Sequence, residues 1–402
     1  MTPAPPDPAS TPATGAAPEP PIAASRLERW LARKLGDRDP KRFGSGWTSG
    51  VISVFLGFCG LGAVAVLHFP QWLSSAELRA QYPLGAMRAL IAAVVGVGFL
   101  LGCVSLLLRR RKALGATGVA LGGLAMLAGG SRVEIDGDLG SPLYQGLDWF
   151  LLNLFVFALV FVPLERLFPQ RHDQRVLRAG WTTDTAYFAV SHLGIQLLTF
   201  LSLLPASLVA AQLTGAGWRT VVQSQPLVLQ VLELMLLGDL AQYWVHRAFH
   251  RVRALWRYHA VHHSCRELDW LAGSRLHLVD VVVTRAAVLV PIFAVGFAPA
   301  ALYVWLVIIG LHATVNHVNL RFQMRWIEQL LVTPRFHHWH HAIEPPDRNF
   351  AVHFPWIDRL FGTFHLPRDA WPERLGTAGD PLPDGYLAQL VYPLRAASAT
   401  TR

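Results

Sequence analysis

Long apolar stretches alternate with short polar and basic segments along most of this 402-residue chain. A helix needs roughly 20 apolar residues to cross a bilayer, and several stretches approach or reach that length. They cover residues 47–69, 84–108, 113–129, 146–164, 185–211 and 226–245. The pattern therefore predicts an all-α fold, a polytopic bundle of membrane helices.

The last apolar stretch, residues 278–315, is long and is interrupted by "GFAPA" at 296–300. Glycine and proline break helices, so this segment predicts a turn between two arms. Each arm has only about 17 residues, which is near the lower limit for a full span. We expect a short or re-entrant hairpin that returns the chain to the side from which it came.

Basic residues gather in three segments and indicate the orientation of the spans. These segments are "RLERWLARKLGDRDPKRF" at 26–43, "RRRK" at 109–112 and "ERLFPQRHDQRVLR" at 165–178. Lys and Arg collect on the cytoplasmic side of membranes, and the alternation of spans then places His246 at the cytoplasmic face. The net charge of +9, with only 15% charged residues, fits attraction to anionic lipid headgroups rather than a nucleic acid partner.

Histidines, rather than cysteines, form the candidate metal site. The three cysteines are widely separated and give no disulfide framework or iron–sulfur ligand run. Eight histidines stand in three clusters: His246 and His250, then His259, His262 and His263, then His337, His340 and His341. Residues at i, i+3 and i+4 share a helix face, so each cluster can bind a transition metal through neutral imidazoles. Eight such ligands exceed the needs of one ion, which predicts two metals.

Other residues near the clusters have competing interpretations. His312 and His317 straddle the end of the hairpin and either could reach the clusters, whereas His277 is more typical of an interfacial residue and His338 faces away on a helix. Asp239 lies two turns before the first cluster and is a candidate to accept a hydrogen bond from a ligand. The alternative is that all the clustered histidines are interfacial residues at the membrane surface. This is less favoured, because crowded imidazoles repel each other when protonated.

Five motifs in the second half of the chain resemble one known family. They are "GDLAQYWVHRAFH", "LWRYHAVHHS", "NHVNL", "VTPRFHHWHH" and "DRNFAVHFPWIDRLFGTF", in this order. Together they resemble the fatty acid hydroxylase/sterol desaturase superfamily of membrane diiron oxygenases. The resemblance implies a cytosolic helical cap that carries two Fe ions on the eight clustered histidines, with His317 as an additional ligand. It also implies that Asn349, Trp356, Asp358 and Gly362 support the cap.

The resemblance also divides the chain. Residues 141–367 match the catalytic region, and residues 26–140 add a basic segment and membrane helices that the family core does not need. Residues 1–25 are rich in proline and alanine and indicate a disordered tail, and residues 368–402 indicate a C-terminal tail. No haem-binding or ferredoxin-like region is present in this sequence, so the resemblance implies a separate electron-donor protein.

The activity implied by the resemblance is O₂-dependent hydroxylation or desaturation of a lipid from the bilayer, and sterols and fatty acyl chains both fit. The ligands alone suit iron, zinc or copper, and zinc can replace iron in a purified protein. A zinc-dependent membrane hydrolase is an alternative, but it would ordinarily show a carboxylate as in H-E-x-x-H. A metal transporter is another, but its ligands would lie within the spans.

Overall fold

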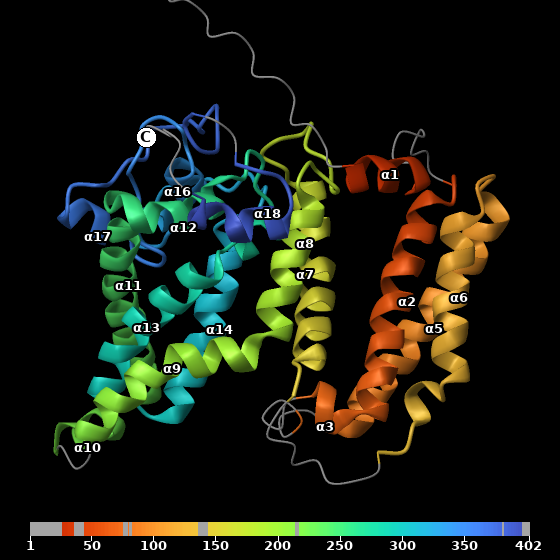
Figure 1. Ribbon diagram of the computed structural model, residues 1–402, viewed down its shortest axis with the longest axis horizontal. Helices are drawn as coiled ribbons and strands as arrows, with labels where there is room; N and C mark the ends of the chain where they lie inside the picture. The colour runs from red at the N-terminus through yellow and green to blue at the C-terminus, as the bar shows by residue number, and fades with distance from the viewer. Residues whose placement is uncertain are drawn as a thin grey trace, which may run out of the picture.

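The computed structural model describes residues 26–35, 44–74, 79, 83–135, 144–213, 217–379 and 382–395. Within these ranges every regular element is a helix, and extended residues pair only in two isolated bridges. The predicted tail at residues 1–25 lies outside the described residues. The all-α class and the membrane bundle predicted from the apolar pattern are confirmed (Figure 1).

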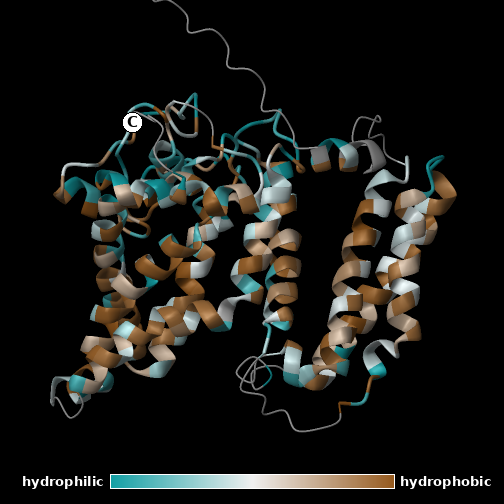
Figure 2. Cartoon of the chain, viewed as in Figure 1, coloured by the Kyte–Doolittle hydropathy of each residue, from teal (hydrophilic) through white to brown (hydrophobic). Residues whose placement is uncertain are grey.

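Six helices are long and apolar enough to cross a membrane. They are α2 (Trp47–His68), α5 (Leu84–Leu108), α6 (Ala113–Leu127, continued by η1, Gly130–Arg132), α7 (Leu147–Leu167), α11 (Leu227–Arg251) and α13 (Leu278–Val295). Hydrophobic residues cover these helices, whereas hydrophilic residues concentrate beyond one end of the bundle (Figure 2). Such a distribution suits a protein whose sides contact lipid and whose one end contacts water.

The stretch expected to cross once at 185–211 is instead bent. It forms α8 (Trp181–Leu193) and α9 (Ile195–Gln212), and the two axes meet at 62°. The break falls at Gly194, and glycine is a poor helix former because it loses the most conformational freedom. After the bend, α9 leads to the short α10 (Gly217–Ser224) at the end of the bundle opposite the cap (Figure 1).

The predicted hairpin is present between α13 and α14 (Pro299–Val315). Gly296 ends α13 with a φ of 81°, a left-handed conformation that favours glycine, and Pro299 begins α14. Both helices pack on α11 through an apolar core that includes Leu234, Ile292 and Trp305. The hairpin thereby returns the chain to the end of α11 that carries the first histidines.

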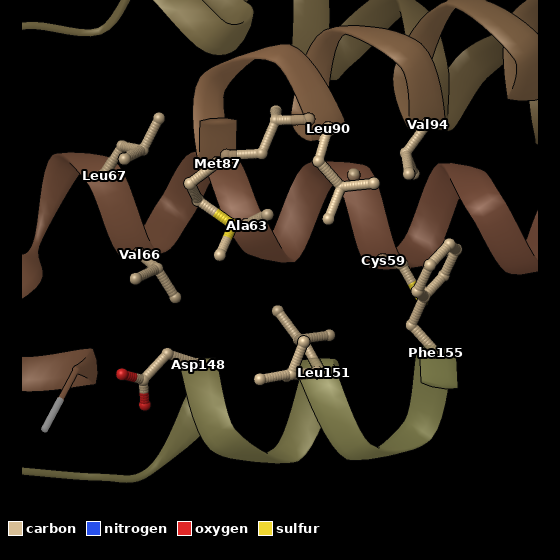
Figure 3. A pocket seen from close by; sticks show the side chains of 13 residues that line it. Cys59, Ala63, Val66, Leu67, Met87, Leu90, Val94, Asp148, Leu151 and Phe155 are labelled. Atoms are coloured by element: carbon tan, nitrogen blue, oxygen red, sulfur yellow. The ribbon is translucent and has the colours of Figure 1, made fainter. Parts of the chain in front are cut away.

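The first three spans form a closely packed unit of their own. Ser53 donates a hydrogen bond of 2.6 Å to the carbonyl of Gly98, and a Cβ at Gly118 would lie 1.9 Å from the Ser53 hydroxyl. An apolar pocket lies where α2 and α5 face α7, with Asp148 at one end (Figure 3). The small α3 (Pro70–Leu73) follows α2 at this end of the unit.

The amphipathic α1 (Arg26–Leu35) lies across the opposite end of the molecule (Figure 1). The Glu28 carboxylate accepts hydrogen bonds from the backbone of Gly180 and Thr182 at the start of α8. A carboxylate in this position also interacts favourably with the helix dipole. Residues of the predicted N-terminal segment therefore contact the predicted catalytic region directly.

Short helices and loops build a cap at one end of the bundle. The basic segments predict that this end faces the cytoplasm. The helices of the cap are α12 (Arg253–His263), η2 (Ala272–Ser274), α15 (Ile327–Leu330), α16 (Pro334–His340), α17 (Pro355–Leu360), α18 (Tyr386–Val391) and η3 (Tyr392–Leu394). Tyr243, Phe336, Phe350 and Ile357 form a buried core between α11 and this cap. This core fixes the cap on the end of the membrane bundle.

Candidate metal centre

Four segments bring the predicted ligands together beneath the cap. The last turns of α11 carry His246 and His250, the end of α12 carries the second cluster, and α16 carries the third. His317 follows α14 at the return of the hairpin. All nine predicted histidines are at most 6% exposed.

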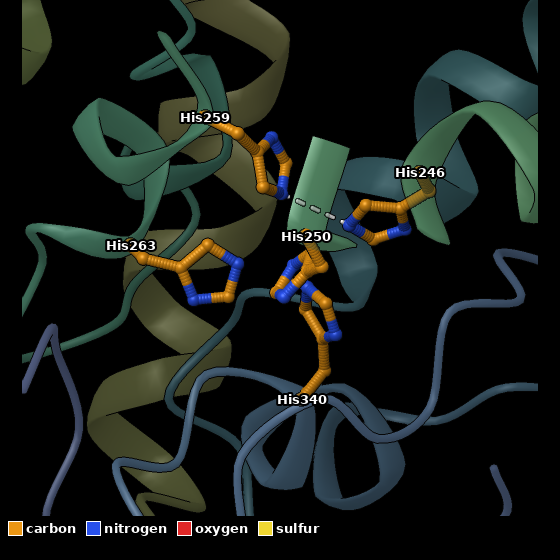
Figure 4. Close-up of side chains that lie close together, drawn as sticks. All are labelled: His246, His250, His259, His263 and His340. Carbon is orange, nitrogen blue, oxygen red and sulfur yellow. Dashed lines mark hydrogen bonds between the residues drawn. The ribbon is translucent and has the colours of Figure 1, made fainter. Parts of the chain in front are cut away.

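The nine histidines separate into two groups, in each of which one nitrogen of every ring lies within 4.8 Å of the others. The first group, called here the five-histidine group, is His246, His250, His259, His263 and His340 (Figure 4). The second, the four-histidine group, is His262, His317, His337 and His341. The predicted second and third clusters thus each divide between the two groups, with ring centroids of His263 and His341 only 4.5 Å apart.

Backbone carbonyls fix the orientation of several rings from outside. The Nδ1 atoms of His246, His262, His317 and His340 donate to the carbonyls of Phe350, Arg275, Ala313 and Arg348 over 2.7–3.2 Å. A carbonyl only accepts, so each of these Nδ1 atoms carries the hydrogen and Nε2 keeps its lone pair. The lone pairs therefore point away from these carbonyls and are available for a cation.

Pairs of these lone pairs face one another inside both groups. In the five-histidine group, Nε2 of His246 lies 3.0 Å from Nε2 of His259, whose Nδ1 is occupied by a carboxylate. In the four-histidine group, the Nε2 atoms of His262 and His317 are 3.3 Å apart. Two bare nitrogen lone pairs at such distances repel unless a cation lies between them. The donor set of each group therefore fits a bound metal ion.

Burial disfavours the charged form of most of these imidazoles. Loss of solvent contact, reinforced by neighbouring imidazoles, lowers the pKa of His262, His263, His337, His340 and His341 well below the usual value. Burial also lowers the pKa of His317 to about 4. Neutral imidazole is the form that binds a metal, so at pH 7 no proton needs to be displaced.

Two carboxylates that the sequence analysis did not select support the five-histidine group. Asp280, near the start of α13, accepts from Nδ1 of His259 at 2.7 Å, and Asp347 accepts from Nδ1 of His250 at 3.1 Å. A carboxylate behind a ligating histidine fixes the ring and raises its basicity. For Asp280, the sequence signal was an acidic residue in the first turn of a largely apolar helix.

The prediction that Asp239 accepts from a ligating histidine is wrong. Its carboxylate instead accepts from the backbone N–H groups of Val352, His353 and Phe354 at 2.7, 3.0 and 2.7 Å. Three strong backbone donors occupy the two oxygens, so no oxygen is turned toward a ring. Asp239 therefore anchors the loop whose residue Phe350 accepts the hydrogen bond from His246.

The remaining histidines lie outside both groups. His312 pairs with His353 through their Nδ1 atoms at 2.6 Å and contacts the carbonyl of Val332. His338 is buried against Trp371, on a different side of α16 from the ligand candidates. His277 accepts from the backbone of Val279 and caps α13. Of the two histidines at the end of the hairpin, only His317 thus joins a group.

A buried ion network supports the four-histidine group from behind. Arg178 forms ion pairs with Asp184 at 2.6 Å and with Asp269 at 2.8 Å, and Arg275 pairs with Asp184 at 2.5 Å. The carbonyl of Arg275 accepts from Nδ1 of His262. Fully paired charges in a buried site hold their backbone in one position, which orients this ring.

We expect Asp280→Asn to weaken metal binding in the five-histidine group by about ten- to a hundredfold, the usual effect of losing such a carboxylate. The measurement is the metal content after dialysis against a graded series of chelator concentrations. Asp347→Asn is the matched comparison, and we expect a smaller effect because its side chain is partly exposed and its contact with His250 is longer. Equal metal retention in Asp280→Asn and the parent would contradict this role.

Fold and site together define a class: an integral membrane protein with two adjacent histidine groups suited to metal ions under a polar cap. A sequence model described as fatty acid hydroxylase matches residues 231–363, which contain all nine histidines. The resemblance of this region to the fatty acid hydroxylase/sterol desaturase superfamily, which its motifs indicated, is thus confirmed.

Curated relatives share this region at modest identity. They include the ornithine lipid hydroxylase OlsE of Rhizobium tropici (29% identical over 42% of this chain and 51% of the relative). The alkylglycerol monooxygenase of Danio rerio is 31% identical over 33% of this chain and 30% of its own length. A very-long-chain aldehyde decarbonylase, GL1-10 of Oryza sativa subsp. japonica, is 26% identical over 33% and 46%. The matches thus span about half or less of each relative, and no solved structure matches the chain.

Proposed function

We propose that this protein is a membrane oxygenase that holds two iron ions and uses O₂ to hydroxylate or desaturate a lipid. The observation that supports this proposal most strongly is the pair of inward-facing lone pairs in each histidine group. In the proposal, the five-histidine group binds one iron and the four-histidine group binds the other. The relatives named as a lipid hydroxylase and a monooxygenase support oxidation of a lipid.

Iron ions, when bound, supply the electrons that break the O–O bond and the oxidant that removes hydrogen from an unreactive carbon. The protein itself contributes the geometry. Carbonyls and the Asp280 carboxylate hold the rings with Nε2 directed inward, so little reorganisation is needed during turnover. Burial of the nine histidines keeps water away from the reacting groups, which limits side reactions of a strong oxidant.

The substrate and partners follow from the position of the centre. The histidines lie at the end of α11, after α14 and on two helices of the cap, where membrane helices meet the cap, so a lipid can approach laterally from the bilayer. We place the cap in the cytoplasm because the described parts of the three basic segments lie at this end (Figure 1). A separate cytoplasmic protein then supplies electrons.

The two alternative classes lack support at the site. Among the described residues, both histidine groups consist of histidine alone, and the nearby carboxylates of Asp280 and Asp347 accept hydrogen bonds from ring Nδ1 atoms instead of standing as the base expected of a zinc hydrolase. The ligand candidates also gather beside the cap rather than forming a path through the spans, as a transporter would need. An oxygenase accounts for the ligand type and the position together.

The test is incorporation of oxygen from O₂ into lipid in living cells, where native electron donors are present. Cells that produce the protein under oxygen-18 gas should contain lipid species that carry one heavy oxygen, or species that have lost two hydrogens. Cells that produce His340→Ala should contain neither, whereas cells that produce His338→Ala should still contain labelled lipid, because this ring belongs to neither histidine group. Unchanged lipids beside a fully iron-loaded protein would contradict the proposal.

A further inference from the structure

An arginine lies within an apolar membrane helix and takes no part in the metal centre. The sequence of α13, "LVDVVVTRAAVLVPIFAV", contains two charged residues, Asp280 and Arg285. Asp280 is accounted for by its hydrogen bond to His259. Arg285 lies one to two turns further into the span and is therefore the charge without an assigned role.

Arg285 lies on the inward side of α13. Val281 and Val288 precede and follow it at spacings of four and three residues, so the three share one helix face. Both valines are buried, at 9% and 4% exposed, yet Arg285 between them is exposed. Arg285 thus keeps accessible surface on a helix face that otherwise packs against protein.

No anion in the described part of the chain compensates this charge. No hydrogen bond or ion pair joins Arg285 to another described residue. An ionisable neighbour on which Arg285 acts is His192 of α8, which is not an anion. The Nδ1 atom of His192 donates to the carbonyl of Phe188 at 2.8 Å, and its ring packs on the Phe188 ring. His192 is therefore held in place beside Arg285 without neutralising it.

A charged side chain at membrane depth is costly to insert, and such residues usually pair with an opposite charge. We propose that Arg285 binds the anionic group, a carboxylate or a phosphate, of the lipid that the metal centre oxidises. This inference rests on the proposed function and names its substrate class. A guanidinium suits either anion because its planar fork donates two parallel hydrogen bonds.

The position of Arg285 also relates the anionic group to the reacting carbon. Five residues separate Asp280 from Arg285, which is about 7.5 Å along a helix. Asp280 contacts the ligand candidate His259. The bound anion and the metals therefore lie at similar depths along the axis of α13. The oxidised carbon is accordingly close to the charged end of the substrate rather than at its far methyl end.

The experiment measures binding of oleate and of oleyl alcohol to the metal-loaded protein in a neutral detergent, without reductant. Oleate should bind the parent protein, and Arg285→Met should weaken this binding about tenfold or more. Arg285→Lys should retain part of the affinity because it keeps the charge. Arg253→Met, which removes an exposed arginine of α12 outside the spans, should bind oleate like the parent. Oleyl alcohol should bind the parent and Arg285→Met alike.

Equal oleate affinity in the parent and Arg285→Met would overturn the proposal. A second arm separates the substrate from a bulk anionic lipid. In cells under oxygen-18, Arg285→Met should retain its metals but lose at least nine-tenths of the labelled lipid. Displacement of oleate by phosphatidylglycerol together with undiminished labelling would show that bulk lipid occupies the site, and the substrate assignment would be wrong. Arg285-dependent oleate binding without labelling in the parent would instead contradict the oxygenase function alone.

Discussion

Replacing His340 by alanine is expected to lower lipid oxidation by more than a hundredfold and to weaken metal binding in the five-histidine group. His340 contributes to this group from α16, and its Nε2 is buried without a hydrogen-bond partner among the described residues. Loss of a supporting carboxylate already costs ten- to a hundredfold, so loss of a ligand should cost more. The four-histidine group keeps all its members in this variant, so we expect about one metal per chain to remain.

The complementary variant is His337→Ala, which removes a member of the four-histidine group. We expect this variant to keep the metal of the five-histidine group and to lose as much lipid oxidation as His340→Ala. His338→Ala is the matched control, because its ring is buried in the same helix and contacts Trp371 and the backbone of His317 and Val318, but belongs to neither histidine group. Metal content measured by mass spectrometry distinguishes these variants. An equal loss of metal in all three would indicate general unfolding and would contradict separate roles for the groups.

Asp239→Ala is expected to destabilise the protein by about 3 kcal/mol or more. The substitution leaves three backbone N–H groups, those of Val352, His353 and Phe354, without their acceptor. Each unsatisfied buried donor costs about 1–3 kcal/mol. The same loop supplies the carbonyl of Phe350 that orients His246, so metal should also dissociate faster. Thermal unfolding in detergent and the rate of metal loss to a chelator measure both effects.

Glu233→Gln is the control for this prediction, because Glu233 lies on the same helix but its carboxylate accepts from the Gln225 side chain. The amide can still accept that hydrogen bond, so we expect stability and metal retention to remain close to those of the parent. If Asp239→Ala behaved like Glu233→Gln, the loop would be held by other contacts, and the anchoring role of Asp239 would be wrong.

Most of the membrane helices could be predicted because length and apolar content suffice for that purpose. The predicted range 84–108 coincides with α5, and the turn at 296–300 follows from glycine and proline chemistry. The bend at Gly194 could not be predicted, because a single glycine within an apolar run is compatible with a straight helix. Its direction depends on the packing of α9 against α13, which are far apart in the sequence.

The gathering of histidines was predictable from helical spacing, but their division into two groups was not. His262 and His263 are adjacent in sequence but belong to different groups, because the two rings face different histidines of α16. The partners of the rings are equally non-local. Asp280 reaches His259 across 21 residues, and the carbonyl of Phe350 reaches His246 across 104. Asp239 shares a helix face with His246, but its partners are backbone groups more than 100 residues further along the chain, so its position in α11 did not indicate its role.

The central claim is that the nine histidines hold two iron ions in two neighbouring groups. The most direct test counts metals per chain by mass spectrometry in protein purified in detergent from iron-supplemented cells. The variant with both His262→Ala and His340→Ala, which removes one member from each group, is measured beside it. The account predicts about two irons per chain in the parent and a loss of both in the double variant. Absence of metal from the parent, or metal unaffected by the two substitutions, would contradict it.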